Sequence, residues 1–160
     1  MDPENKIHDP EIIIRNAEID DLGQIFHLGE KLFTSQDYTN LYRTWDEYEV
    51  THLFNVESDY MLVAQANDKV IGFAMGSIIE KSRSAWTYGY LIWLGVNPSY
   101  ARQGIAGMLF EKFKAIMKKQ GVRILIVDTQ ADNEKAINFF KQKGFVNPID
   151  HVYMTLNLET

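Results

Sequence analysis

The residues between 96 and 109 have the types and spacing that bind an anion. Pro98 ends an apolar run that reads as a strand, because proline has no N–H to donate to a sheet ladder. The first turn of a helix carries N–H groups without acceptors and a partial positive charge, so it stabilises a phosphate. Arg102 can add a charge-assisted hydrogen bond. Small residues that let an anion approach the backbone stand where a helical pattern begins: Gly104, Ala106 and Gly107.

The same pattern also fits a tight strand-to-helix turn in which the two glycines serve packing alone. It is not a nucleotide P-loop, because no Gly-Lys-Ser/Thr follows. It is not a dinucleotide fingerprint either, since those glycines directly follow the first strand of a βαβ unit. The local pattern therefore predicts an anion site at a helix N-terminus.

Hydrophobic periodicity and capping residues predict the elements that position this loop. Helices are expected after Asp20, from Thr44 to about Phe54, from about Arg102 to Lys119, and from about Asn133 to Lys143. Strands are expected over residues 12–17, 60–66, 70–79, 86–96, 124–127 and 152–158. This order predicts a mixed sheet with an antiparallel front and a right-handed parallel βαβ centre. Ligands of such sheets gather at the carboxyl ends of the parallel strands.

Length and composition predict a single domain over residues 1–160, with residues 1–10 as a flexible N-terminus. The net charge of -6 argues against general nucleic-acid binding. Residues 101–145 carry a charge of +5 and the rest of the chain carries -11. This split fits an anionic ligand on one part and a cationic one on the other, and it also fits a lysine-rich solvated helix face.

The absence of cysteine excludes disulfides, thiolate metal sites and a cysteine nucleophile. The four histidines lack ligand spacing, so we expect no metal. No apolar stretch is long enough to span a bilayer, and the first residues lack the apolar core of a signal peptide. We therefore expect a cytoplasmic protein with no membrane partner.

Two motifs make the chain resemble the GCN5-related N-acetyltransferase (GNAT) superfamily over essentially its whole length. The family's pyrophosphate motif, Q/R-x-x-G-x-G/A, matches residues 101–106, with Ala101 in place of the usual Gln or Arg. The second motif, N-x-x-A-x-x-x-Y-x-x-x-G-F, matches Asn133, Ala136, Phe140, Gly144 and Phe145. The resemblance implies an α/β (mixed α+β) GNAT fold with a central mixed sheet of about 6–7 strands and helices on both faces.

The resemblance also implies acetyl-coenzyme A (acetyl-CoA) as co-substrate and names the residues that would hold it. The strand before the loop would lend backbone groups to the pantetheine arm, at Leu94, Gly95 and Val96. The pyrophosphate would bind at Arg102, Gln103, Gly104, Ile105, Ala106 and Gly107. Asn133 would lie near the pantetheine, with Phe139, Phe140 and Lys143 along the far side of the cofactor. Asn133 also fits a simple helix N-cap, and the two roles are compatible.

Acetylation of an amine needs a route for the proton, because a primary amine with a pKa of about 10.4 is almost wholly protonated at pH 7. Related protein N-terminal acetyltransferases carry a Glu or His base at the position of Asp128, which makes Asp128 the candidate base. The alternative is a strand-end aspartate that caps the loop. Glu47, Glu49 and Glu80 are other acidic candidates, or serve as surface charges or substrate-recognition groups.

Phe140 stands where many family members have a tyrosine that is thought to protonate the departing thiolate. Loss of a general acid costs about 10² to 10⁴ in rate. A thiol pKa of about 8.5, however, makes the thiolate of coenzyme A a tolerable leaving group. We therefore expect activity with the acid unassigned; water, Tyr153 or a tyrosine between Gln36 and Tyr42 could serve.

The strand before the loop is rich in aromatic residues, which are mostly core or sheet surface. One face of it should still meet the acceptor groove, so the candidate substrate-binding residues are Tyr90, Trp93 and Glu80. Without cysteine, we expect direct attack in a ternary complex.

Together these patterns predict an acyltransferase: an N-acetyltransferase for a peptide amine or a small cationic amine. The alternatives are a non-catalytic acyl-CoA sensor or regulatory domain, signalled by Phe140, and a chain that keeps only the fold. The chain could form a homodimer, and the sequence leaves its oligomeric state open.

Overall fold

The computed structural model describes residues 10–34, 44–83 and 85–159. The chain divides into two compact units, Met1–Ile126 and Val127–Thr160, and each is described by itself. The single domain expected over residues 1–160 stays a prediction. Most of the expected flexible N-terminus, residues 1–9, and the candidate tyrosine acids Tyr38 and Tyr42 lie outside the described residues.

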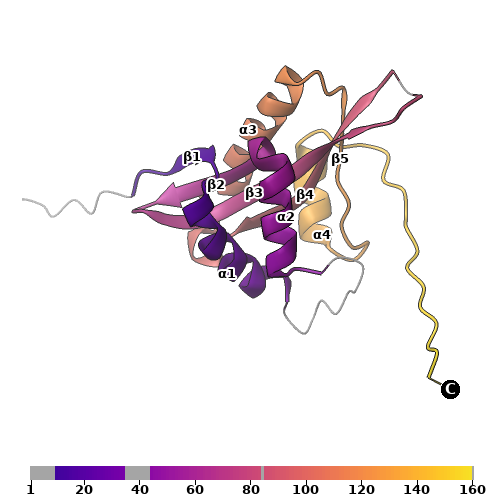
Figure 1. Ribbon diagram of the computed structural model, residues 1–160, viewed down its shortest axis with the longest axis horizontal. Helices are drawn as coiled ribbons and strands as arrows, with labels where there is room; N and C mark the ends of the chain where they lie inside the picture. The colour runs from indigo at the N-terminus through magenta and orange to yellow at the C-terminus, as the bar shows by residue number, and fades with distance from the viewer. Residues whose placement is uncertain (1–9, 35–43, 84, 160) are drawn as a thin grey trace, which may run out of the picture. The chain divides into compact units, whose positions relative to one another are not determined.

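The first unit is built on one mixed sheet, whose five strands follow the order β1-β2-β3-β4-β5 (Figure 1). The first four strands pair antiparallel, and β4 pairs with β5 in parallel. The antiparallel front and the parallel β4–α3–β5 unit are as predicted. The strands are β1 (Ile13–Asn16), β2 (Met61–Ala66), β3 (Lys69–Glu80), β4 (Thr87–Val96) and β5 (Ile124–Ile126).

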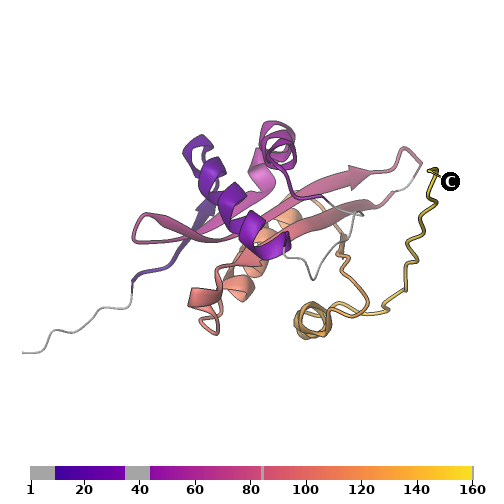
Figure 2. The same ribbon diagram turned by 90° about the horizontal axis from the view of Figure 1, so that it is seen from below.

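Helices cover both faces of this sheet (Figure 2). α1 (Leu22–Phe33) and α2 (Glu47–Glu57) lie on one face, and α3 (Ile105–Lys119) lies on the other. Glycines in the strands let the helices pack close to the sheet on each face. A Cβ on Gly95 would lie 2.7 Å from Leu32 Cδ1 in α1, and a Cβ on Gly76 would collide with the Phe113 ring in α3.

An apolar core lies between the sheet and the first two helices. Its fully buried members include Ile25 of α1, Val50 of α2 and Phe73 of β3, each 1% exposed or less. The described residues of the first unit also form three short 3₁₀ turns: η1 (Ile19–Asp21), η3 (Ser58–Tyr60) and η4 (Pro98–Tyr100).

The expected sheet of six to seven strands has five in the described residues, and the missing strand is the last one. Residues 146–159 form no strand, although their apolar side chains alternate. Val152, Met154, Leu156 and Leu158 are each more than three-quarters exposed. Alternation predicts which way side chains point in a strand, but a strand also needs a neighbouring backbone to pair with. That requirement cannot be read from one segment.

The second unit contains one helix, α4 (Glu134–Gln142), followed by an extended segment to residue 159. The helix was predicted from Asn133 to Lys143, and these two residues are its N-cap and C-cap.

Candidate functional site

The loop that leads into α3 has a left-handed backbone at two positions. Gly104, the N-cap of α3, has a φ of 73°, which glycine adopts without steric cost. Arg102 has a φ of 63°, which costs a residue with a Cβ about 1–2 kcal/mol. Turns of this kind aim successive backbone N–H groups into a concavity that binds anions.

The start of α3 leaves its first amides available to a ligand. The first helical hydrogen bond is donated by Met108 N–H to Gly104 O, at 3.0 Å, so the amides of residues 105–107 precede the ladder. A Cβ on Gly104 would meet nothing within 4 Å, and residues 101–104 are all exposed. Arg102 forms no ion pair with another described residue. Exposed amides at a helix start beside a cationic side chain are groups that can bind an oxyanion.

Packing holds the start of α3 beside the end of β4. Ile105 is only 2% exposed. A Cβ on Gly72 in β3 would meet Ile105 Cγ2 at 3.3 Å and the carbonyl oxygen of Gly95 at 3.1 Å. The start of α3 is thus fixed beside the strand segment that includes Gly95.

Within the described residues of the first unit, one edge of β4 is open over the second half of the strand. β4 pairs with β3 as far as Val96↔Gly72, but its pairing with β5 ends at Tyr90↔Ile126. Within the described residues of the first unit, no strand pairs with the other edge of residues 91–96. Leu94, Gly95 and Val96 lie on this edge, where an extended chain with amide groups could pair with the backbone.

A β-bulge interrupts β4 where the open edge begins. Met75 pairs with Trp93 and Gly76 pairs with Leu91, so Ile92 is an extra residue on β4. Because of the extra residue, the side chains that follow Ile92 lie on the opposite face of the sheet from the one that regular alternation would give them. A Cβ on Gly89 would meet Met117 of α3, whereas a Cβ on Gly95 would meet Leu32 of α1.

The two aromatic candidates of β4 differ in their surroundings. Trp93 is 8% exposed, and its ring lies 4.8 Å from that of Phe33 and 5.0 Å from that of Trp45. Its indole Nε1 donates a hydrogen bond to Glu49 Oε1 of α2 at 3.2 Å. Tyr90 is half-buried and pairs with Ser77 on one side and Ile126 on the other. Trp93 therefore belongs to the aromatic packing beneath α1 and α2.

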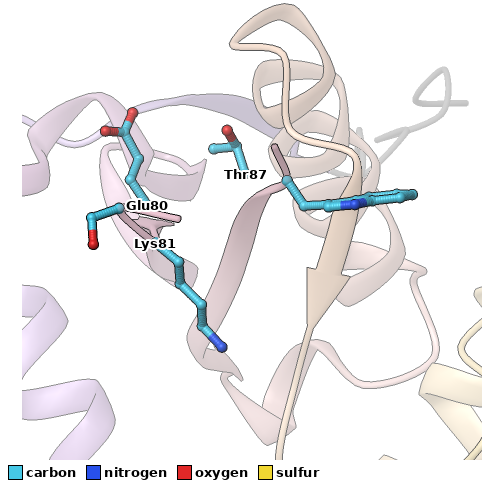
Figure 3. Close-up of a pocket in the computed structure, with 5 residues that line it drawn as sticks. Glu80, Lys81 and Thr87 are labelled. Carbon is cyan, nitrogen blue, oxygen red and sulfur yellow. The ribbon is translucent and has the colours of Figure 1, made fainter. Parts of the chain in front are cut away.

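Glu80 lies at the exposed end of β3, opposite Thr87. With Lys81, Ser82, Trp86 and Thr87 it lines a hollow of about 410 Å³ (Figure 3). The negative charge of Glu80 also acts on Tyr60: burial raises the pKa of the Tyr60 hydroxyl, and the charges of Glu57, Asp59 and Glu80 raise this pKa further. A second hollow, of about 370 Å³, lies between α1 and the start of α2. Neither hollow is lined by the 101–107 loop.

In the second unit, the residues of the second motif delimit α4. Asn133 Oδ1 accepts from Ala136 N–H at 3.1 Å, and Asn133 Nδ2 donates to Thr129 Oγ1 at 3.2 Å. At the other end Gly144 has a φ of 97°, and Phe145 N–H donates to Phe140 O at 3.0 Å. The N-cap predicted for Asn133 is thereby confirmed.

Rings pack on one another along the end of α4. The Phe140 ring lies 5.3 Å from that of Phe139 and 5.4 Å from that of Phe145, edge to face in both cases. Lys143 Nζ lies 5.8 Å from the centre of the Phe139 ring. Phe140 thus has a packing role as well as a position in the motif.

The candidate base and the candidate acid both lie in the second unit. Asp128 is exposed and stands two residues after the end of β5 in the chain. Tyr153 is 52% exposed, in the extended segment. Their catalytic roles stay predictions.

Three features of the site were not predicted: the left-handed backbone of Arg102, the bulge at Ile92 and the contact between Trp93 and Glu49. No local pattern signals the first two. The described residues contain no group of three His, Asp or Glu side chains that could hold a metal, and none of the described helices is long and apolar enough to cross a membrane.

Several proteins that resemble this chain are named acetyltransferases. The profile of the acetyltransferase (GNAT) family matches residues 24–145. N-alpha-acetyltransferase 30 of Schizosaccharomyces pombe is 28% identical over 106 residues, which cover 66% of this chain and 70% of that protein. An uncharacterized N-acetyltransferase of Methanocaldococcus jannaschii is 30% identical over 138 residues, which cover 82% of this chain but only 59% of that protein.

A solved structure shows the same fold at lower identity. The aminoglycoside N-acetyltransferase crystallised in complex with CoA matches with a TM-score of 0.73 at 18% identity, over 94% of this chain and 97% of that one. The family match covers most of the chain, so the chain belongs to the acetyltransferase (GNAT) family. It is an acetyltransferase.

Proposed function

We propose that this chain transfers an acetyl group from acetyl-CoA to a primary amine by direct attack in a ternary complex. The observation that carries the proposal is the 101–107 loop. It combines left-handed Arg102 and Gly104 with three helix amides that precede the α3 ladder. This arrangement binds a pyrophosphate without needing the Gln or Arg that Ala101 replaces.

The residues of the first unit fit coenzyme A at two places. The loop has open space above Gly104 for the pyrophosphate. The open edge of β4 reaches the neighbourhood of Ile105 at Leu94, Gly95 and Val96, and there it can pair with the amides of the pantetheine arm. The further cofactor contacts that the resemblance implies, at Asn133, Phe139, Phe140 and Lys143, stay predictions from the sequence.

Acetyl-CoA supplies an activated acyl group, and the chain has to bind it, orient the amine and give the amine's proton a route. The amine nitrogen forms a bond to the thioester carbonyl carbon as the C–S bond breaks, and the thiolate takes up a proton. We propose Asp128 as the group that receives the amine proton. Because Phe140 has no proton to donate, water or Tyr153 is left to protonate the thiolate.

The acceptor we propose is a cationic amine, either a peptide N-terminus or a small molecule. The charge of -11 outside residues 101–145 favours a positive partner. The relatives include an N-alpha-acetyltransferase and an aminoglycoside N-acetyltransferase, which fit the two kinds of acceptor. The cytoplasmic location and the homodimer stay predictions.

The test is release of coenzyme A thiol from acetyl-CoA with and without a panel of unblocked peptides, linear monoamines and polyamines. We expect release that depends on the amine and yields one acetylated amine per thiol. Amine-independent release, or none with any acceptor despite bound CoA, would contradict the proposal.

The non-catalytic alternative has one observation in its favour, the Phe140 ring that stands in place of a tyrosine. An acyl-CoA sensor would bind CoA tightly and show no turnover with any amine. Binding at about 100 times the dissociation constant should raise the free energy of unfolding by about 2.7 kcal/mol, so a thermal shift detects it. Turnover with even one amine would exclude the non-catalytic sensor.

A further inference from the structure

The part of β4 that follows the bulge pairs with a neighbouring strand on one side only, among the described residues of the first unit. It pairs with β3 from Trp93↔Met75 to Val96↔Gly72, whereas the pairing with β5 has already ended. A bulge disrupts the ladder locally. A shift by one residue there would turn every following side chain to the other face of the sheet. Side-chain contacts therefore have to fix the register of residues 93–96.

Trp93 makes such contacts with the helices that cover one face. Its side chain is 8% exposed, and its ring centre lies 4.8 Å from that of Phe33 in α1 and 5.0 Å from that of Trp45. Its Nε1 donates a hydrogen bond to Glu49 Oε1 of α2 at 3.2 Å. Glu49 is itself held at the start of α2, where its N–H donates to Asp46 Oδ1 at 2.7 Å. The hydrogen bond thus ties the residue after the bulge to a fixed point on α2.

The observed register also places Gly95 beneath α1. A Cβ on Gly95 would lie 2.7 Å from Leu32 Cδ1. A shift by one residue would bring the side chain of Leu94 or Val96 to this place, where neither fits. The same shift would move the Trp93 side chain to the opposite face, away from Glu49. The contacts of Trp93 and the packing of α1 therefore select the same register.

The loop at the start of α3 is held by a different contact. Ile105 packs against Gly72 of β3, where a Cβ would meet Ile105 Cγ2 at 3.3 Å. This contact does not involve Trp93 or Glu49. A change in the register of β4 can therefore displace the backbone of residues 94–96 while the amides of residues 105–107 stay in place.

We propose that Trp93 is a positioning residue: through its hydrogen bond to Glu49, it holds the backbone of residues 94–96 in the register that binds the pantetheine arm. Neither side chain has to touch the cofactor or the acceptor for this role. The inference rests on the proposed function and deepens it, because it assigns the support of the arm to a contact between β4 and α2.

The test measures the Kd of two ligands for Trp93→Phe. One is CoA, and the other is the phosphorylated ADP that forms the nucleotide half of CoA and has no arm. Phe keeps a ring in the core but cannot donate the hydrogen bond. We expect the Kd of CoA to rise about 10-fold, the lower end of the range for a hydrogen bond to a charged group. The Kd of the nucleotide should stay within about threefold of the wild-type value.

Variants of α2 separate the hydrogen bond from other effects. Glu49→Leu removes the acceptor and should give the same two results as Trp93→Phe, whereas Glu49→Gln keeps an acceptor and should bind CoA within about threefold of wild type. The double variant should bind CoA no more weakly than either single variant, because both changes remove the same hydrogen bond. Glu57→Leu is the matched control: it removes another half-buried glutamate of α2 and should leave both Kd values unchanged.

Equal weakening of CoA and the nucleotide would overturn the inference, because a general loosening of the fold predicts it. So would wild-type CoA affinity in both Trp93→Phe and Glu49→Leu. Failure of the wild type to bind CoA would refute the proposed cofactor site itself. CoA binding by the wild type without acetyl transfer would refute only the proposed function.

Discussion

Substitution of Gly104 tests the anion site most directly, because the structure separates the backbone effect from the charge effect. Gly104 has a φ of 73° and open space where a Cβ would stand. Any side chain there should cost about 1–2 kcal/mol in the free energy of unfolding from the left-handed backbone alone. In a domain of this size that lowers the Tm by roughly 2–8 °C.

Gly121 is the matched control for backbone strain. It has a φ of 80° at the other end of α3, and a Cβ there would also meet nothing within 4 Å. Gly104→Ala and Gly121→Ala should therefore lower the Tm by similar amounts. Only Gly104→Ala should change the affinity for CoA.

Gly104→Glu and Gly104→Gln have nearly the same shape and differ in charge. One unit charge about 5 Å from a phosphate charge, at an effective dielectric of about 20, gives roughly 3 kcal/mol of repulsion. That energy corresponds to about a 100-fold increase in the Kd of CoA for Glu relative to Gln.

The assay is calorimetric titration of CoA into each variant at about 50 mM and about 500 mM salt. Salt screens the repulsion, so the difference between Glu and Gln should shrink at the higher concentration. Equal CoA affinities for wild type and Gly104→Glu at low salt would refute the placement of the pyrophosphate on this loop.

Three further predictions concern catalysis and stability. Asp128→Asn should lower kcat about 100-fold or more with CoA affinity unchanged, and a wild-type pH-rate profile in this variant would remove Asp128 as base. Phe140→Tyr should keep the fold and change kcat less than about 10-fold, because a thiolate leaves without much help; a gain of about 100-fold would show that the wild type lacks an acid that it needs. The hydrogen bond from Arg15, at 2.9 Å to Asp21 Oδ1, holds the pKa of Asp21 below its usual range, and the Glu18 N–H lowers it further. Asp21 therefore adds stability above its unfolded pKa of about 3.9, which is lost as the pH falls through the lower folded value. Asp21→Asn should cost about 1.5–3 kcal/mol at pH 7 by thermal unfolding, and the gap to wild type should narrow in acid; a gap independent of pH would contradict the pairing.

Elements with local signals were predicted from the sequence, and those that depend on distant partners were not. The turn between β2 and β3 needs left-handed residues, and Asn67 and Asp68 supply them with φ of 47° and 59°. The helix α3 follows from its apolar stripe, and β4 lies parallel to β5 because the crossover connection requires it. The last expected strand depended on a pairing partner that the alternation of residues 152–158 does not specify.

The bulge at Ile92 shows a second kind of limit. Nothing in the run from Trp86 to Val96 distinguishes a bulged strand from a regular one, because the signal lies in the register with β3. In a strand without the bulge, side chains would alternate regularly beyond Ile92, and the Trp93 side chain would lie on the opposite face of the sheet. The hydrogen bond between Trp93 and Glu49 therefore cannot be predicted from the sequence, although the sequence offers both residues as candidates for substrate recognition.

The two family motifs also differ in what the structure explains. In the second motif the structure gives Asn133, Gly144 and Phe145 roles in starting and ending α4, so stability alone accounts for these residues. In the first motif, Arg102 is exposed and holds a left-handed backbone that an unstrained turn could avoid. Backbone strain without a packing reason points to function. The 101–107 loop is therefore a stronger indication of ligand binding than the second motif. For substitutions in α4, the affinity for CoA has to be measured together with the activity, because loss of the helix and loss of the cofactor would both lower the activity.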